Sequence, residues 1–189
     1  MRKSKIEAAE TRQHIVSVAS EEFRLNGIAS TGVVPLMSKA GLTHGGFYKH
    51  FESKEQLVAE ACALAVEGLV DKFNTASAAG GEQGFRAIIE SYLSADHSQN
   101  PEQGCPLAAM GSELVRSDDY TRQVASQGFY DLVGVLAKSL GNPNSEKVQS
   151  QAVFAMAAMV GAVTVSRIMS DEAASLAVLN TVQQHLSVM

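Results

Sequence analysis

Residues 31–54 read TGVVPLMSKAGLTHGGFYKHFESK, and this stretch decides the fold. It predicts a short helix ending near Ala40, a turn at Gly41, a second short helix after Thr43 and a longer helix after Ser53. That order is a helix-turn-helix with a supporting helix. The second helix is too short to be stable alone and is polar on one side. We therefore expect it to present side chains to an external partner, and the leading hypothesis is the major groove of DNA.

Capping residues set the expected boundaries of these helices. Thr31 is a plausible cap for the first short helix, and the side-chain oxygen of Thr43 is expected to cap the second. Ser53 and Gln56 fit a capping box that opens a helix reaching about residue 77. Val34 is expected among the buried residues of the first short helix.

An amphipathic helix is predicted before this stretch, over residues 7–26. Ile15, Ala19 and Phe23 recur every fourth residue and define its buried face. Gly27 is expected to end it, because glycine accepts the left-handed conformation of a helix C-terminus. Three helices would then share one small core.

Charge is divided unevenly along the chain. Residues 1–54 hold eight Lys or Arg against five Asp or Glu, whereas residues 55–189 hold seven against fifteen. A basic N-terminal part on an acidic body suggests a polyanionic partner at one end only. The alternative is that Arg2, Lys3 and Lys5 form a solvated tail, which accounts for the whole excess.

The whole chain is expected to be all-α, because Ala, Leu and Val recur throughout and proline is scarce. Two domains are predicted: residues 1–53 as a three-helix DNA-binding unit and residues 54–189 as a larger helical ligand-binding and dimerisation domain. Segments 76–84 and 97–104 are expected to be loops, and Ser117 is expected to cap a helix. Further helices are predicted over about 54–77, 85–96, 106–117, 118–141, 145–169 and 171–186.

The helix predicted over about 145–169 is apolar on most of its circumference. It carries small residues that allow another helix to approach closely, namely Ala157, Ala158, Gly161 and Ala162. Such a helix must be buried on more than one side. Either the domain core surrounds it or it forms part of a subunit interface, and the residues alone leave both open.

Other sequence features limit which chemistry and which cellular compartment we expect. Cys62 and Cys105 are isolated thiols without metal-ligand spacing, so a reducing compartment and no metal or cofactor are expected. The basic N-terminus is not followed by an apolar run, so no signal peptide is expected. The apolar stretch 153–165 is too short to span a bilayer. We therefore expect a soluble, cytoplasmic protein without a membrane partner.

One set of residues in the N-terminal segment forms a recognisable pattern: Arg12, Ile15, Ala19, Phe23, Gly27, Thr31, Ala40, Gly41, Thr43, Gly46, Tyr48, His50, Phe51, Ser53 and Lys54. With this pattern the segment resembles the DNA-binding domain of TetR-type transcriptional repressors. A second, shorter resemblance is that of residues 104–109, GCPLAA, to C-terminal domains found in that family.

The resemblance implies a homodimer of all-helical subunits that pair through their last two helices, which favours the interface interpretation. Two reading heads would then contact an inverted-repeat operator with half-sites about 34 Å apart. It further implies repression that is relieved when a small molecule, whose identity the sequence does not reveal, binds the C-terminal domain.

Candidate DNA contacts lie on and around the predicted reading helix. Thr43 is interpreted as both cap and contact, and Lys54 in a first helical turn opposes the helix dipole unless it meets a phosphate. The candidates are Thr31, Thr43, His44, Gly45, Gly46, Tyr48, Lys49, His50 and Lys54.

Several of these candidates have structural alternatives. Gly45 and Gly46 allow either close approach to DNA or tight packing of a short helix. Tyr48 has the alternative of a core tyrosine with its hydroxyl at the edge. His50 has the alternative of a bond to a neighbouring backbone group.

Ligand-pocket candidates are aromatic, methionine and cysteine side chains, although such residues at helical spacing are usually core. Cys105, just before a helix, is a candidate sensor of oxidants or electrophiles through a lowered thiol pKa, with an inert half-buried thiol as the alternative. The candidates are Tyr92, Cys105, Met110, Phe129, Phe154 and Met159.

Two other classes of protein compete with a DNA-binding regulator. An enzyme is disfavoured because no nucleophile elbow, phosphate loop or metal-binding motif occurs and the five histidines are scattered. A helical protein-interaction module predicts no salt-dependent DNA binding.

Overall fold

Residues 5–189 are described by a computed structural model, and every regular element among them is a helix. Arg2 and Lys3 of the basic tail lie outside the described residues. In chain order the elements are α1 (Lys5–Asn26), α2 (Val33–Lys39), the 3-10 helix η1 (His44–Lys49), α3 (Lys54–Ala76), the 3-10 helix η2 (Ser77–Ala79), α4 (Gly81–Tyr92), α5 (Ala95–Gln99), the 3-10 helix η3 (Pro101–Gln103), α6 (Pro106–Leu114), α7 (Asp119–Leu140), α8 (Glu146–Ile168) and α9 (Glu172–Leu186).

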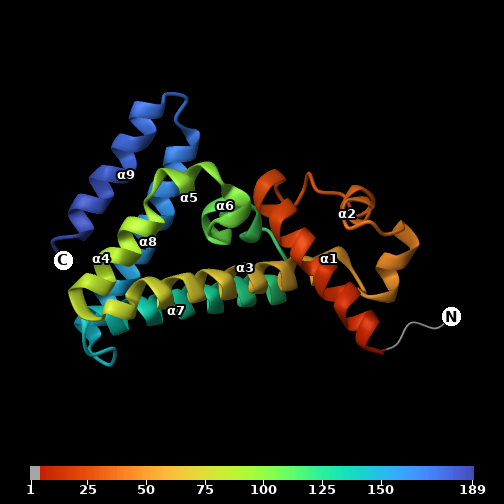
Figure 1. Cartoon of the computed structure of the whole chain (residues 1–189), viewed down its shortest axis with the longest axis horizontal. Helices are drawn as coiled ribbons and strands as arrows, with labels where there is room; N and C mark the ends of the chain where they lie inside the picture. Colours follow the sequence, from red (N-terminus) through yellow and green to blue (C-terminus); the bar gives the residue numbers. More distant parts are fainter. Residues whose placement is uncertain (1–4) are drawn as a thin grey trace.

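The N-terminal head consists of α1, α2 and η1, and it lies at one end of the molecule (Figure 1). Gly27 and Gly41 adopt φ angles of 85° and 70°, so the two predicted left-handed turns are confirmed. The predicted reading helix is present, but as a 3-10 rather than an α-helix. Ile15, Phe23 and Phe47 are fully buried in the core of the head.

Three local predictions for the head were wrong. Gly32, not Thr31, is the N-cap of α2, because the Thr31 hydroxyl donates a 2.7 Å hydrogen bond to the Gly27 carbonyl instead. Thr43 occupies the N-cap position of η1, but its side chain makes no capping hydrogen bond. Val34 is 58% exposed rather than buried.

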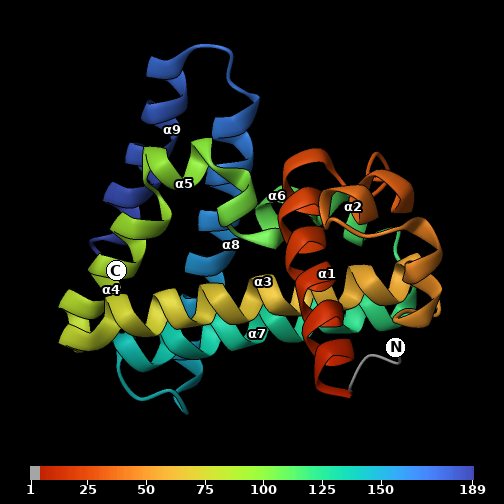
Figure 2. The ribbon, with the colours of Figure 1, turned by 45° about the vertical axis from the view of Figure 1, so that its right-hand side comes forward.

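Helix α3 joins the head to the body, and its predicted capping box is confirmed. The Ser53 hydroxyl accepts the Gln56 N–H at 3.2 Å, and the Gln56 side chain accepts the Glu52 N–H at 2.8 Å. Its first half packs in the core of the head and its second half in the core of the body. Helices α3 and α7 run side by side along the length of the molecule (Figures 1 and 2). A side chain at Gly128 would collide with Val66, so this glycine permits their close contact.

The two predicted loops of the body are largely helical. Segment 76–84 contains η2 and the first turn of α4, and segment 97–104 contains the end of α5 and all of η3. The polar and glycine-rich composition of these segments did not indicate their short helices. The predicted cap Ser117 was also one residue early, because Asp118 accepts the Thr121 N–H at 3.0 Å and caps α7.

The body core is formed by α3, α4, α7, α8 and α9, with Ile88, Leu132, Met156 and Val163 fully buried. Helix α8 is long and apolar enough, by length and composition alone, to cross a bilayer. One face of α8 instead packs into this core, and α9 packs beside it (Figure 1).

The opposite face of α8 remains exposed. It carries Phe154, Val165 and Ile168, with Ala157 and Gly161 between them. This helix therefore has both characters considered from its sequence: a buried core face and an uncovered apolar face.

Candidate functional site

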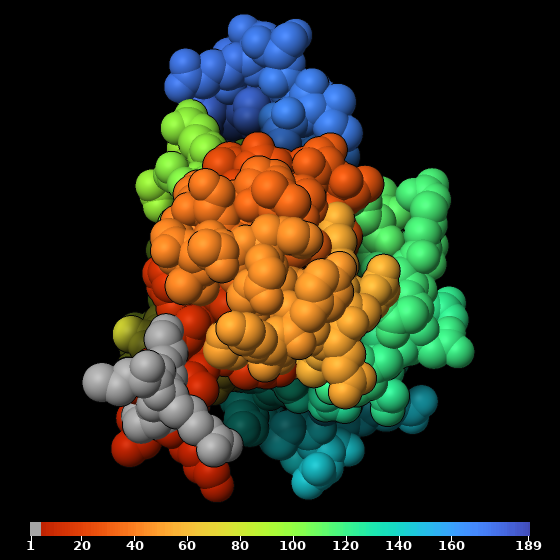
Figure 3. Space-filling model, turned by 90° about the vertical axis from the view of Figure 1, so that its right-hand side faces the viewer, coloured from red at the N-terminus to blue at the C-terminus, as the bar shows by residue number. Residues whose placement is uncertain are grey.

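The segment that contains η1, drawn in orange, lies near the centre of the end face formed by the head (Figure 3). Thr43, His44 and Lys49 are exposed, and the Tyr48 side chain is 67% exposed. These four side chains therefore lie on one surface that a long polyanion can reach.

Buried aromatic contacts hold η1 in place. Phe47 is fully buried, stacks on Phe51 at 5.4 Å between ring centroids and meets Tyr48 edge-on at 5.1 Å. Because Phe47 is anchored in the core, the exposed residues of η1 have a fixed orientation. The Tyr48 hydroxyl is thereby directed away from the core, so its ring is not a core tyrosine.

Arg12 of α1 fastens the end of η1 to α3. Its guanidinium makes a two-bond ion pair with Glu60, one of the bonds measuring 2.6 Å, and donates from Nε to the His50 carbonyl at 3.2 Å. The guanidinium also lies 4.6 Å above the Phe51 ring centre. This geometry fixes the position of the reading helix relative to α1 and α3.

The two glycines of η1 are not required by internal packing. A Cβ atom at Gly45 would meet nothing within 4 Å, and one at Gly46 would make only an ordinary 3.6 Å contact with Met37. Tight packing therefore does not explain the Gly45 position, and close approach to DNA at this residue stays a prediction.

Thr31 and Lys54 are directed inward, unlike the other candidates. The Thr31 side chain is 6% exposed and bonded to the Gly27 carbonyl. The Lys54 ammonium donates to the Ile28 carbonyl and lies 5.9 Å from the Phe23 ring centre. These contacts explain a lysine in a first helical turn without a phosphate, so we leave both residues out of the proposed contact surface. His50 is partly buried at the edge of that surface.

The six pocket candidates do not line one cavity. Met110 packs in the core of the head, Met159 is fully buried in the core of the body, and Phe154 is 60% exposed on α8. Phe129 lines an open apolar groove between α6, α7 and α8. Only Tyr92 lines the cavity between α3, α4 and the α5–η3 segment.

The expectation of a lowered thiol pKa at Cys105 was wrong. Its side chain is fully buried, and burial raises the pKa of the thiol above its usual value. Cys62 is also buried, which raises the pKa of its thiol to about 12. Neither thiol has the exposed, electropositive surroundings of a reactive cysteine.

His97 connects the Tyr92 cavity to the start of α6. Its Nε2 accepts the Cys105 N–H at 2.8 Å, so the ring proton lies on Nδ1 and is donated to the Tyr92 carbonyl at 2.6 Å. Burial lowers the pKa of His97 to about 4, so the ring is neutral at neutral pH. The carbonyl of Gly104, the residue before Cys105, accepts a 3.0 Å hydrogen bond from Arg24 of α1.

Two matches with known families cover most of the chain. Residues 15–61 match the bacterial regulatory proteins of the tetR family, and residues 82–185 match the C-terminal domain of LmrA/YxaF-like transcriptional regulators. The chain belongs to the TetR family of transcriptional regulators. This membership assigns it to regulators rather than to enzymes.

Individual relatives match only part of this TetR-family chain. The transcriptional regulator AcrR of Shigella flexneri is 44% identical over 64 residues, which are 34% of this chain and 30% of AcrR. TtgW of Pseudomonas putida, an uncharacterized HTH-type regulator, is 32% identical over 102 residues, which are 54% of this chain and 75% of TtgW. The match to SrpR of the same species covers 47% of SrpR, so the chain spans less than half the length of AcrR and SrpR.

Solved structures extend the likeness to nearly the whole chain. A TetR regulator from Chloroflexus aurantiacus has a TM-score of 0.78 at 25% identity, covering 96% of this chain and 94% of that one. The reduced form of Escherichia coli NemR has a TM-score of 0.79 at 19% identity, covering 95% and 96%, which shows a shared fold.

Three residues that organise this TetR-family site were given no role from the sequence. Arg12 fixes η1, Arg24 contacts Gly104, and Glu113 contacts the loop after α1. Their partners lie 38 to 85 residues away along the chain, so no local pattern indicated them.

Proposed function

We propose that this TetR-family protein is a DNA-binding transcriptional repressor that inserts η1 into the major groove. The observation that carries the proposal is the orientation of η1: Phe47 anchors it from inside, whereas Tyr48 and Lys49 are exposed. In this arrangement Lys49 and Tyr48 contact phosphates, and Thr43 and His44 face base edges. Gly45, Gly46 and His50 complete the contact surface.

The protein acts as a homodimer through α8 and α9. Support comes from the apolar face of α8, where Phe154, Val165 and Ile168 lie exposed at helical spacing. Small residues between them, Ala157 and Gly161, allow a second α8 to approach closely. Two heads related by a twofold axis require an inverted-repeat operator with half-sites about 34 Å apart.

A small molecule that binds the body releases the repressor from DNA. Support comes from the direct polar contacts between body and head, Arg24 to Gly104 and Glu113 to the loop after α1. A displacement of α6 reaches the head through these contacts. Residues 1–53 act as the reading domain and residues 54–189 as the regulatory and dimerisation domain, in the cytoplasm and without a cofactor.

The decisive experiment is fluorescence anisotropy with labelled duplexes from the region upstream of the gene, competed by scrambled DNA over a range of salt concentrations. The expected result is preference for an inverted repeat and a log affinity that falls linearly with log salt. Absence of salt-dependent DNA binding at every tested duplex would instead support a helical protein-interaction module.

A further inference from the structure

The Tyr92 hydroxyl is an unsatisfied polar group in the body. Its side chain is 2% exposed, and the hydroxyl has no hydrogen-bond partner among the described residues. The Cys105 thiol lies close enough to raise the pKa of the phenol, but a thiol is a weak partner. A buried polar group without a strong partner is costly, so this hydroxyl requires an explanation.

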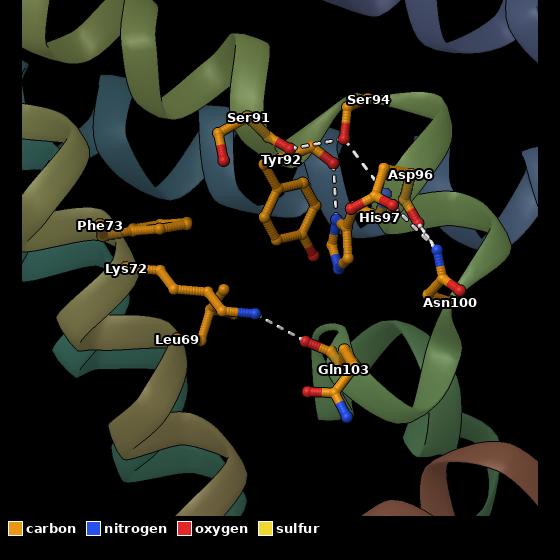
Figure 4. A pocket seen from close by; sticks show the side chains of 10 residues that line it. All are labelled: Leu69, Lys72, Phe73, Ser91, Tyr92, Ser94, Asp96, His97, Asn100 and Gln103. Carbon is orange, nitrogen blue, oxygen red and sulfur yellow. Dashed lines mark hydrogen bonds between the residues drawn. The ribbon is translucent and has the colours of Figure 1, made fainter.

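The hydroxyl points into a cavity of about 280 Å³ between α3, α4 and the α5–η3 segment (Figure 4). The Lys72 side chain extends from α3 into the same space. Its ammonium donates one hydrogen bond, at 2.9 Å, to the Gln103 carbonyl. An ammonium has three protons, so Lys72 retains donors for a molecule in the cavity.

Two other polar side chains around this space, His97 and Asp96, are paired with protein groups. Both ring nitrogens of His97 are used, by the Tyr92 carbonyl and the Cys105 N–H. The Asp96 carboxylate accepts a 3.0 Å bond from Asn100 at the rim. Tyr92 and Lys72 therefore offer donors to a molecule in the cavity, because burial raises the pKa of Tyr92 well above its usual value and keeps its proton in place.

The side of the cavity formed by α3 also carries apolar residues. Leu69 and Phe73 of α3 line it, and the Phe73 ring meets the Tyr92 ring edge-on at 5.9 Å. A ligand that fits has an apolar body and one acceptor group, and a cationic donor beside the acceptor position favours an anionic acceptor.

We propose that this cavity binds a small carboxylate with an apolar body. The carboxylate lies between the Tyr92 hydroxyl and the Lys72 ammonium, and the body lies against Leu69 and Phe73. The effector role of this ligand rests on the proposed repressor function, whereas its binding does not.

The cavity is linked to the head by a short series of hydrogen bonds. The His97 ring is hydrogen-bonded to both the Tyr92 carbonyl and the Cys105 N–H. Arg24 of α1 donates a hydrogen bond to the adjacent Gly104 carbonyl. A ligand that shifts Tyr92 therefore shifts the start of α6 and the end of α1. This places the carboxylate site where it controls the orientation of the head.

Calorimetry on the full-length protein without DNA tests the site, with benzoate and hexanoate as probes and benzyl alcohol and hexanol as size-matched neutral controls. We expect at least one carboxylate to bind at least tenfold more tightly than its alcohol. Tyr92→Phe, which removes only the hydroxyl, should weaken that binding about tenfold, and Lys72→Met should weaken it further. Tyr130→Phe, at an exposed tyrosine on α7, should leave it unchanged.

Carboxylates that bind no better than their alcohols, or equal binding by wild type and a Tyr92→Phe variant of unchanged thermal stability, would overturn the proposal. A second arm adds the tighter-binding carboxylate to the protein–operator complex and follows anisotropy. Release supports the effector role, and binding without release removes that role but retains the site. If no operator is bound, the repressor function fails while calorimetry still decides the site.

Discussion

Glu113 of α6 accepts the backbone N–H groups of Ile28 and Ala29, at 2.9 and 2.7 Å, and so ties the body to the loop after α1. The carbonyl of Ile28 accepts a hydrogen bond from the Lys54 ammonium. The backbone of Ile28 is thus bonded through its N–H to Glu113 of α6 and through its carbonyl to Lys54 of α3.

Glu113→Ala removes both acceptors and should lower the free energy of unfolding by about 1–3 kcal/mol, because it leaves two N–H groups without their partner. Glu113→Gln retains one acceptor and should lower the free energy of unfolding by less than Glu113→Ala does. Urea denaturation measures both, with Glu90→Gln on the exposed side of α4 as control. Equal stability of Glu113→Ala and wild type would show that these hydrogen bonds do not contribute to the free energy of unfolding.

Substitution of Gly45 should separate stability from DNA affinity. Gly45→Ala should stabilise the fold by about 0.5–1 kcal/mol, because the added methyl group meets no atom within 4 Å and the unfolded chain loses freedom. The same methyl group should weaken operator binding by obstructing close approach. Gly68→Ala, at an exposed and equally open position in α3, should stabilise the protein and leave affinity unchanged. An undiminished affinity of Gly45→Ala would contradict close approach at this residue.

Lys49→Ala and Tyr48→Phe should weaken operator binding while leaving the thermal midpoint and the dimer intact, since both side chains are exposed. Each lost Lys–phosphate contact should flatten the slope of log affinity against log salt by about 0.9. Lys138→Ala, at an exposed lysine near the end of α7, should keep the wild-type slope. Unchanged affinity in both head variants would exclude η1 as the reading helix.

Acidification should destabilise the protein through His97. Its pKa is lowered to about 4 in the folded state by burial, against about 6.5 when unfolded, so between these values only the unfolded chain takes up the proton. Stability should fall as the pH drops through this window, by roughly 3 kcal/mol for the full shift. Urea denaturation at pH 7.5 and 4.5 should show a smaller pH-dependent loss for His97→Gln. The same loss in both proteins would assign it to other groups.

Phe154→Glu should dissociate the dimer, because it places a charge on the exposed apolar face of α8. Sedimentation velocity measures the shift to monomer, and operator affinity should fall in parallel. Tyr120→Glu introduces the same charge at an exposed aromatic residue of α7 and should remain dimeric. A Phe154→Glu protein that sediments as the wild type does would place the interface elsewhere.

The head was predictable because its signals are local. Gly27 and Gly41 mark left-handed turns, and Ser53 with Gln56 marks a helix start within four residues. Thr31 failed as a cap because its hydroxyl found a carbonyl four residues back, a choice that depends on the loop already being folded.

The cavity was less predictable because helical spacing identifies a buried stripe but not the neighbour that covers it. Met110 faces the head and Phe154 faces outward, although both resemble core residues in sequence. His97 was interpreted as part of a polar loop, yet tertiary contacts bury it between Tyr92 and Cys105.

The contacts that Glu113 and Arg24 make between head and body share one chemical property. Glu113 binds main-chain N–H groups, and Arg24 binds a main-chain carbonyl. The side chains at positions 28 and 29 can therefore change without removing the hydrogen-bonding groups, whereas position 104 requires glycine, because a Cβ atom there would lie 2.7 Å from the His97 ring. A chimaera that joins this body to a reading head of different DNA preference should retain both contacts, provided that Arg24 and Glu113 are kept.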